Sequence, residues 1–184
     1  MRLYKEAMEM TSKISVDLIL SEEECSGFWD LMAQIPPGGT AVEIGCYRGR
    51  SSSLMLQAAQ DNHFLSIHVD PWTTGEAHEW MGMAQKIPAP FVVLKMTSEQ
   101  ALALPWLANV PLDLVYIDGD HETPAVEIDV KWGERIKPGG ILCAHDYGRD
   151  FLSGVEITLK NYVKAPWWQM LGVWGTLAAW RKVL

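Results

Sequence analysis

Apolar residues occur in short continuous runs that are separated by segments with helical spacing. The runs at residues 40–46, 64–69, 91–95, 112–117 and 141–144 predict buried strands. The intervening segments predict helices that start at Ser51, span residues 76–86, start at Ser98, and run from Pro124 to Ile136. Because strands and helices alternate, we expect an α/β fold with a doubly wound, mostly parallel sheet.

The two ends of the chain show different patterns. Ser21 and Glu24 have capping-box spacing, which predicts a helix that ends before the Pro36–Gly39 stretch. A late helix is expected from Leu152 to Tyr162, where apolar residues recur at helical spacing. The tail from residue 167 to 184 alternates and offers a turn at Gly175, so it predicts a terminal antiparallel strand pair.

Composition narrows the class of protein. With 184 residues, 48% of them hydrophobic, the chain can bury one core, and we expect one domain over residues 1–184. A formal net charge of −8 argues against nucleic acid as a partner and favours a small uncharged or cationic substrate. Three widely spaced cysteines suggest neither a disulfide framework nor a cysteine zinc site. No signal peptide or membrane span is recognised, so a cytoplasmic protein is expected.

The segment Val42 to Ser52 reads as a strand, a glycine turn and a helix start. Gly45 and Gly49 allow the backbone to turn sharply and approach a ligand, and Glu43 adds a carboxylate. The spacing lacks the full dinucleotide fingerprint, and a carboxylate would repel a pyrophosphate but attract a sulfonium. The segment therefore favours S-adenosylmethionine as the cofactor, although such a turn can also be ordinary loop chemistry.

A second carboxylate fits the same interpretation. Asp70 follows the strand at 64–69 and lies 25 positions after Gly45 (70 − 45 = 25). An acid about 20 residues beyond the first glycine binds the ribose hydroxyls in folds of this kind. The simpler alternative for Asp70 is a turn residue before proline.

Acidic residues and histidines follow the last two central strands. Asp118 and His121 come after the strand at 112–117, and His145 and Asp146 come after the strand at 141–144. Adjacent parallel strands would place these side chains together, and convergent carboxylates need a cation, a proton or a substrate hydroxyl between them. The segment predicts a divalent metal site, against the alternative that each residue is a turn, cap or hydrogen-bonding residue. Asp129 and Glu134, on the next helix, are expected to face solvent.

These motifs together resemble the class I S-adenosylmethionine-dependent methyltransferases. The matching residues are Glu-Ile-Gly-x-Tyr-x-Gly-x-Ser from residue 43, the Asp70 strand end, Ile-Asp-Gly-Asp-His from residue 117 and the His-Asp-Tyr after Pro-Gly-Gly. The chain looks most like catechol-O-methyltransferase-like and macrocin-type O-methyltransferase domains, over roughly residues 38–180. The resemblance implies a Rossmann-like fold, with a cofactor-binding core at 38–180 and an N-terminal helical cap at 1–35.

The resemblance also implies roles for individual residues. Glu43, Gly45 and Tyr47 would border the methionine part of the cofactor, Ser51 and Ser52 would lie at the start of the first helix, and Ser98 and Glu99 would flank the adenine. Asp118, His145 and Asp146 match the metal ligands of metal-dependent members. His145 departs from the usual all-oxygen set, so magnesium, manganese, iron and zinc all stay open. His121 is the candidate general base, with His145 as the second choice.

Three functions remain open at this point. The first is methyl transfer to a small-molecule hydroxyl, assisted by a divalent cation. The second is a nicotinamide-dependent oxidoreductase, and the third is a cofactor-binding domain without catalysis. The acceptor and the oligomeric state are not encoded in a pattern that we recognise, although the apolar tail is a candidate homo-oligomer interface.

Overall fold

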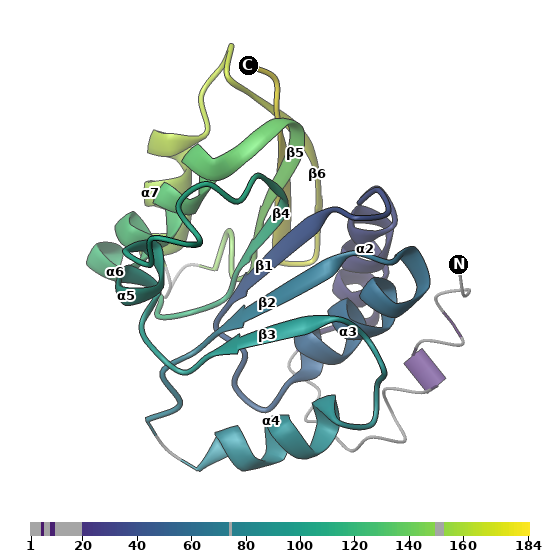
Figure 1. Ribbon diagram of the computed structural model, residues 1–184. Coiled ribbons are helices and arrows are strands. Elements are labelled where there is room, and N and C mark those ends of the chain that lie inside the picture. Colours follow the sequence, from purple (N-terminus) through teal and green to yellow (C-terminus); the bar gives the residue numbers. More distant parts are fainter. Residues whose placement is uncertain (1–4, 6–7, 10–19, 74, 150–152) are drawn as a thin grey trace.

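The computed structural model describes residues 5, 8–9, 20–73, 75–149 and 153–184. Its centre is a seven-stranded sheet with the order β3-β2-β1-β4-β5-β7-β6, shown in Figure 1. The strands are β1 (Thr40–Ile44), β2 (Leu65–Val69), β3 (Phe91–Leu94), β4 (Leu112–Ile117), β5 (Ile136–Ala144), β6 (Trp168–Trp174) and β7 (Leu177–Lys182).

The first five strands pair in parallel, whereas β7 runs antiparallel to both β5 and β6. The predicted fold class, with its terminal antiparallel pair, is therefore confirmed. The strand order reverses direction between β1 and β4. A reversal of this kind opens a crevice beyond the carboxyl ends of the strands, which is where such folds bind ligands.

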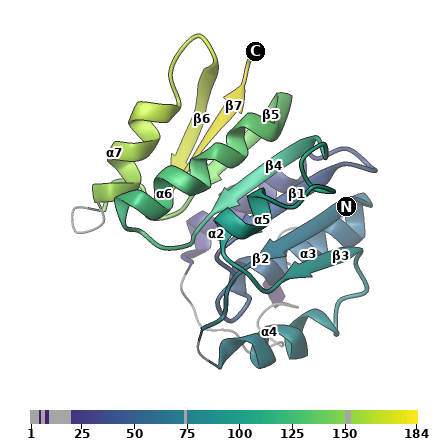
Figure 2. The same ribbon diagram turned by 60° about the vertical axis from the view of Figure 1, so that its left-hand side comes forward.

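Helices cover both faces of the sheet, as Figures 1 and 2 show. On one face lie α2 (Glu22–Met32) and α3 (Arg50–Asn62), and on the other lie α5 (Ser98–Leu102), α6 (Thr123–Asp129) and α7 (Ser153–Tyr162). Successive residues of a strand face opposite sides of the sheet. Leu114 belongs to the core that contains Phe28 and Leu54, whereas Val115 belongs to the core that contains Val126 and Leu159. The remaining helix, α4 (Glu76–Ala84), packs its buried Trp80 near the β3 edge.

Local departures from the prediction concern element boundaries. The helix expected from Pro124 to Ile136 is α-helical only to Asp129 and continues as a 3-10 helix over Val130–Arg135. Ile136 already belongs to β5, so the Pro-Gly-Gly stretch does not separate a helix from a strand as predicted. It forms part of β5 instead, with Pro138 and Gly139 exposed and Gly140 buried, where the pairing register with β4 shifts.

The predicted capping box of α2 is confirmed, because Ser21 accepts from the Glu24 amide and Glu24 accepts from the Ser21 amide. Leu152 and residues 1–4, 6–7 and 10–19 of the proposed cap at residues 1–35 lie outside the described residues, so the division of the domain stays a prediction. Within the described part, no helix is both long enough and apolar enough to cross a lipid bilayer.

Candidate functional site

The carboxyl ends of four neighbouring strands lie side by side. Ile44 of β1 pairs with Val69 of β2 and with Ile117 of β4, and Ile117 pairs in turn with Ala144 of β5. The residues that follow, Gly45, Asp70, Asp118 and His145, therefore emerge at one level along the edge of the sheet. Gly45 has a φ of 83°, and a Cβ there would collide with the Asp118 carbonyl, so the two turns touch through their backbones.

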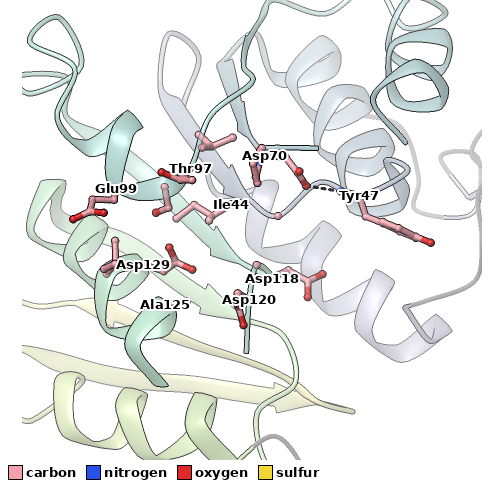
Figure 3. Close-up of a pocket in the computed structure, with 15 residues that line it drawn as sticks. Ile44, Tyr47, Asp70, Thr97, Glu99, Asp118, Asp120, Ala125 and Asp129 are labelled. Carbon is pink, nitrogen blue, oxygen red and sulfur yellow. Dashed lines mark hydrogen bonds between the residues drawn. The ribbon is translucent and has the colours of Figure 1, made fainter. Parts of the chain in front are cut away.

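A pocket of about 520 Å³ opens at this edge, and we call it the cofactor pocket (Figure 3). Its volume is within the range of sites that hold ligands of nucleoside size. Its wall combines apolar residues with carboxylates and hydroxyls from the ends of β1, β2 and β4, from α5 with its N-cap Thr97, and from α6. The lining residues are Ile44, Gly45, Tyr47, Val69, Asp70, Pro71, Thr97, Ser98, Glu99, Asp118, Gly119, Asp120, Ala125, Ile128 and Asp129.

Asp70 holds two unusual turns in place beside the pocket. Its Oδ2 accepts from the amides of Cys46 (2.8 Å) and Tyr47 (2.9 Å), and its Oδ1 accepts from the amide of Trp72 (2.6 Å). Tyr47 and Trp72 have φ angles of 44° and 40°, which bulky residues rarely adopt and which indicate backbone strain. A carboxylate has about four acceptor positions. Three are used here, so Asp70 has room for one ribose hydroxyl rather than the two that the sequence suggested.

Four residues predicted to contact the cofactor are not among those lining the pocket. Glu43, Ser51 and Ser52 lie beneath it and form, with His68, a set that we call the buried cluster. Both serine hydroxyls donate to Glu43, and the Nδ1 of His68 lies 2.6 Å from Glu43 Oε2. All four side chains are at most 5% exposed. The buried cluster therefore ties the start of α3 to β1 and β2.

Gly49, the fourth of these residues, has a packing role. It is the N-cap of α3 with a φ of 97°, and a Cβ there would press against the side chains of Met83 and Trp80 of α4. The glycine thus allows α4 to approach the turn. A role of these four residues in binding the cofactor stays a prediction.

The far end of the pocket lies between α5 and α6. Ser98 and Glu99 line it as predicted, and Ser98 accepts a hydrogen bond of 2.9 Å from Trp132 Nε1. Asp129 also lines it and is only 3% exposed, so the expectation that it faces solvent was wrong. Burial, partly offset by a hydrogen bond with Ser98, raises the pKa of Asp129 to about 6. The sequence signal was available, because Asp129 lies one helical turn after Ala125, which faces the same pocket (Figure 3). Glu134 is exposed, as predicted.

The predicted acidic and histidine residues converge at the other end of the pocket. We call Asp118, His121, His145 and Asp146 the rim cluster. His121 Nε2 lies 2.9 Å from Asp146 Oδ2 and 4.0 Å from Asp118 Oδ1. His145 Nδ1 lies 3.2 Å from Asp118 Oδ1 and 3.4 Å from Asp146 Oδ2. Asp146 has a φ of 59°, an uncommon backbone conformation that directs this side chain.

The charges in the rim cluster determine its protonation. The carboxylates of Asp118 and Asp146 raise the pKa of His121 to about 9. Burial alone would lower the pKa of His145, but the carboxylates of Asp118 and Asp146 have the larger effect and raise this pKa to about 10. Burial would also raise the pKa of Asp146, yet the two imidazoles hold it below its ordinary value. Both histidines are thus imidazolium ions at neutral pH, and an imidazolium has no nitrogen free to accept a proton.

The donor set of the rim cluster fits a divalent cation. Ligand atoms of Asp118, His121 and Asp146 lie within 4.8 Å of one another. His121 Nε2 is close to Asp146 but has no hydrogen-bond partner among the described residues, so it is held next to the carboxylate without being satisfied by it. Two carboxylates and one imidazole suit manganese, iron or zinc, and the carboxylates alone suit magnesium. The geometry favours His121 over the predicted His145 as the imidazole ligand, because the other nitrogen of His145 faces Glu24 at 3.5 Å.

Comparison with known families supports this geometry. Residues 42–147, which contain the glycine turn, Asp70 and the whole rim cluster, match a family described as methyltransferase domain. The match spans the carboxyl ends of β1, β2, β4 and β5, so it covers every strand that contributes to the site.

Solved structures show the same fold at low sequence identity. Cofactor-bound Rv0187 from MTB is 18% identical with a TM-score of 0.70, and the match covers 97% of this chain and 88% of that protein. The O-methyltransferase TomG from Streptomyces achromogenes, solved with its methyl donor SAM, is 14% identical with a TM-score of 0.69, over 98% and 89% of the two chains. An rRNA methylase from Streptococcus thermophilus is 10% identical with a TM-score of 0.66, over 91% and 100%. The shared fold therefore does not select the acceptor.

Proposed function

This chain belongs to the methyltransferase domain family, and we propose that it transfers a methyl group from S-adenosylmethionine to a hydroxyl oxygen of a small molecule, with a divalent cation bound at the rim cluster. The class of enzyme, an S-adenosylmethionine-dependent methyltransferase, follows from the family match and the fold. The hydroxyl acceptor and the cation are the proposal.

One observation carries the proposal: Asp118 belongs to both the cofactor pocket and the rim cluster. In the proposed complex its carboxylate would lie between the donor methyl and the acceptor oxygen. Asp118 Oδ2 accepts a hydrogen bond of 2.9 Å from the buried Tyr116 hydroxyl, which fixes the orientation of the carboxylate and leaves Oδ1 directed at the histidines.

The pocket would hold the adenine and the sulfonium of the cofactor at opposite ends. Asp129, Ser98 and Glu99 would receive the adenine, and the remaining acceptor position of Asp70 would bind a ribose hydroxyl. Gly45 and Asp118 would border the sulfonium end, where a carboxylate stabilises positive charge. Among the residues that the family resemblance points to, Tyr47 is 44% exposed and its ring turns away from the adenine end in Figure 3, so it would border the open side of the methionine part.

The chemistry requires alignment and proton removal. S-adenosylmethionine supplies an already activated methyl: the sulfur–methyl bond breaks, the bond from oxygen to methyl forms, and the hydroxyl proton leaves. The rim carboxylates and His121 would hold a cation that lowers the pKa of the acceptor hydroxyl. A protonated His121 cannot serve as the general base predicted from the sequence, and as a cation ligand it must be neutral. We therefore assign His121 to the ligand set.

The test combines binding with turnover. Calorimetry should show S-adenosylhomocysteine binding to the purified chain. Transfer of labelled methyl from S-adenosylmethionine to a panel of vicinal diols should fall to background with a chelator and return with magnesium or manganese. Turnover that is unaffected by the chelator would reject the cation. Transfer only to amines or carbon acids would reject the hydroxyl acceptor.

A further inference from the structure

A second cavity lies next to the rim cluster. Its volume is about 980 Å³, and its charged lining residues are Lys5, Glu22, Glu23, Glu24, Arg50 and Arg149. Two of these residues contact the rim cluster directly. Arg149 Nε lies 2.8 Å from Asp146 Oδ1, and Glu24 Oε1 lies 3.5 Å from His145 Nε2. The second cavity therefore borders the rim cluster through these two side chains, and we call it the acceptor cavity.

Two charged side chains of the acceptor cavity, Arg149 and Glu24, have well-defined partners. Arg149 is paired with Asp146, as described. Glu24 Oε1 accepts from the amide and the hydroxyl of Thr176 at 2.8 and 2.7 Å, and Glu24 Oε2 accepts from the Ser21 amide at 2.7 Å. These bonds outweigh the effect of burial and lower the pKa of Glu24 to about 2, so it stays ionised and occupied.

Arg50 differs from these two residues. It is only 6% exposed, and within the described part of the chain its Nε has no hydrogen-bond partner. Among the described residues its guanidinium makes one hydrogen-bond contact, from Nη2 to Cys25 Sγ at 3.9 Å. Burial raises the pKa of that thiol, so Cys25 carries no charge that could neutralise the guanidinium. Over the described ranges, no carboxylate lies within ion-pair distance of Arg50. A buried cation without an anion is costly, and its presence in a cavity wall points to a ligand that supplies the anion.

We propose that the acceptor is a small hydroxylated carboxylic acid, whose carboxylate binds Arg50 and whose hydroxyl lies at the rim cluster. This inference rests on the proposed function. The planar guanidinium presents paired N–H donors that match the two oxygens of a carboxylate. Glu22 and Glu23 also line the cavity and would repel a dianion, which disfavours a phosphate monoester. The local charge at Arg50 thus reverses the expectation of an uncharged or cationic substrate that the net charge of the chain suggested.

The experiment compares an acid with its neutral counterpart. Binding of a vicinal dihydroxybenzoate and of its methyl ester is measured by ligand-observed NMR titration, with S-adenosylhomocysteine present, on the wild type and on three variants. Arg50→Met removes the charge at similar length, and Arg50→Lys keeps the charge without the planar fork. Arg48→Met is the matched control, because Arg48 lies in the same turn, is about one-third exposed and pairs with Glu79 at 3.3 Å.

We expect the wild type to bind the acid about 10- to 100-fold more tightly than the ester, as charge-assisted hydrogen bonds provide. The ratio should fall to about one in Arg50→Met, keep an intermediate value in Arg50→Lys, and stay unchanged in Arg48→Met. If Arg50→Met does not fold, the inference is tested by comparing the acid-to-ester affinity ratio of Arg50→Lys with that of the wild type. A wild-type ratio near one, no saturable binding of the acid, or a ratio unaffected at Arg50 would overturn the inference.

These outcomes are separable from failure of the proposed function. Loss of that function would appear as no binding of S-adenosylhomocysteine, or as no methyl transfer to an acid that binds through Arg50. Acid preference without Arg50 dependence would instead leave methyl transfer standing and remove only the role assigned here.

Discussion

The buried cluster and the rim cluster contain the same chemical groups but differ in their role. Each contains a carboxylate at the carboxyl end of a central strand and an imidazole from a neighbouring segment. The buried cluster has Cys46 next to it, and both sites bring at least three side chains that can bind a metal within reach of one another. In the buried cluster Glu43 and His68 are fully buried, and Glu43 receives hydrogen bonds on both oxygens. In the rim cluster the side chains of Asp118 and His121 are 18% and 35% exposed, and the ring nitrogen of His121 that faces the carboxylates has no hydrogen-bond partner.

The difference shows that residue type alone does not identify a reactive site. A carboxylate whose acceptor positions are filled by serines and a histidine contributes to the fold, because removing any partner leaves a buried polar group unsatisfied. A partly exposed carboxylate beside a partly exposed imidazolium can exchange the proton of that ring for a cation. We therefore expect substitutions in the buried cluster to affect stability and substitutions in the rim cluster to affect turnover.

The largest expected effect is on turnover in Asp118→Asn. The amide oxygen still accepts from Tyr116, so the fold should hold, while the lost charge weakens the cation site. We expect kcat/KM to fall about a thousandfold, since a cation supplies several kcal/mol of stabilisation to the reaction. Initial rates and thermal melts measure the two quantities, with Asp30→Asn on the exposed face of α2 as the control. Normal rates in Asp118→Asn would remove the distinction between the clusters.

The second expected effect is on stability in Glu43→Gln. The amide nitrogen would replace one of the two accepting oxygens, so it would face either the Ser51 hydroxyl or the Ser52 hydroxyl together with His68 Nδ1. His68 is fully buried and would lose its charged partner. We expect the free energy of unfolding to fall by about 3 kcal/mol, as for other broken buried pairs. Urea titration measures this change. An unaltered midpoint, together with reduced turnover, would assign Glu43 to catalysis after all.

A third effect concerns Asp129, a buried carboxylate that has no basic partner among the described residues. The pKa of Asp129 is about 6 in the folded chain and 3.8 ordinarily, so the stability of the fold falls as the pH rises from about 4 to about 6. Below that window both states are protonated and there is no penalty. We expect Asp129→Asn to be more stable than the wild type by about 3 kcal/mol at pH 7 and equal to it near pH 3.5.

Denaturant titrations of both proteins across this range provide the measurement. A stability difference that does not vary with pH would show that Asp129 ionises freely in the folded protein. The end of the pocket between α5 and α6 would then be more hydrated than the 3% exposure of Asp129 indicates.

Sequence patterns predicted the elements well because their signals are local. The strands of the parallel sheet, the capping box at Ser21 and the turn at Gly175 each depend on residues within one element. The pattern also placed Asp118, His121, His145 and Asp146 on one edge, because parallel strands with short crossovers leave few alternatives. Boundaries such as that of β5 at Ile136 depend on pairing with β4, which no local signal reveals.

It was harder to predict which polar residues stabilise the fold and which are available to bind a ligand. Glu43 looked like a ligand-binding carboxylate, and only its contacts with Ser51, Ser52 and His68 show that its acceptor positions are filled. Arg50 looked like an ordinary helix residue, and only its burial without an anion makes it a candidate. Such assignments depend on which side chains from distant elements satisfy one another, and a single sequence does not specify that.

Calorimetric titration of manganese into the chain, with S-adenosylhomocysteine bound, tests the central claim most directly. We expect one cation site in the wild type, loss of that site in Asp118→Asn and Asp146→Asn, and its retention in His68→Gln. Retention of the site in both rim variants, or its loss in His68→Gln while the chain stays folded, would contradict the assignment of the rim cluster as the cation site.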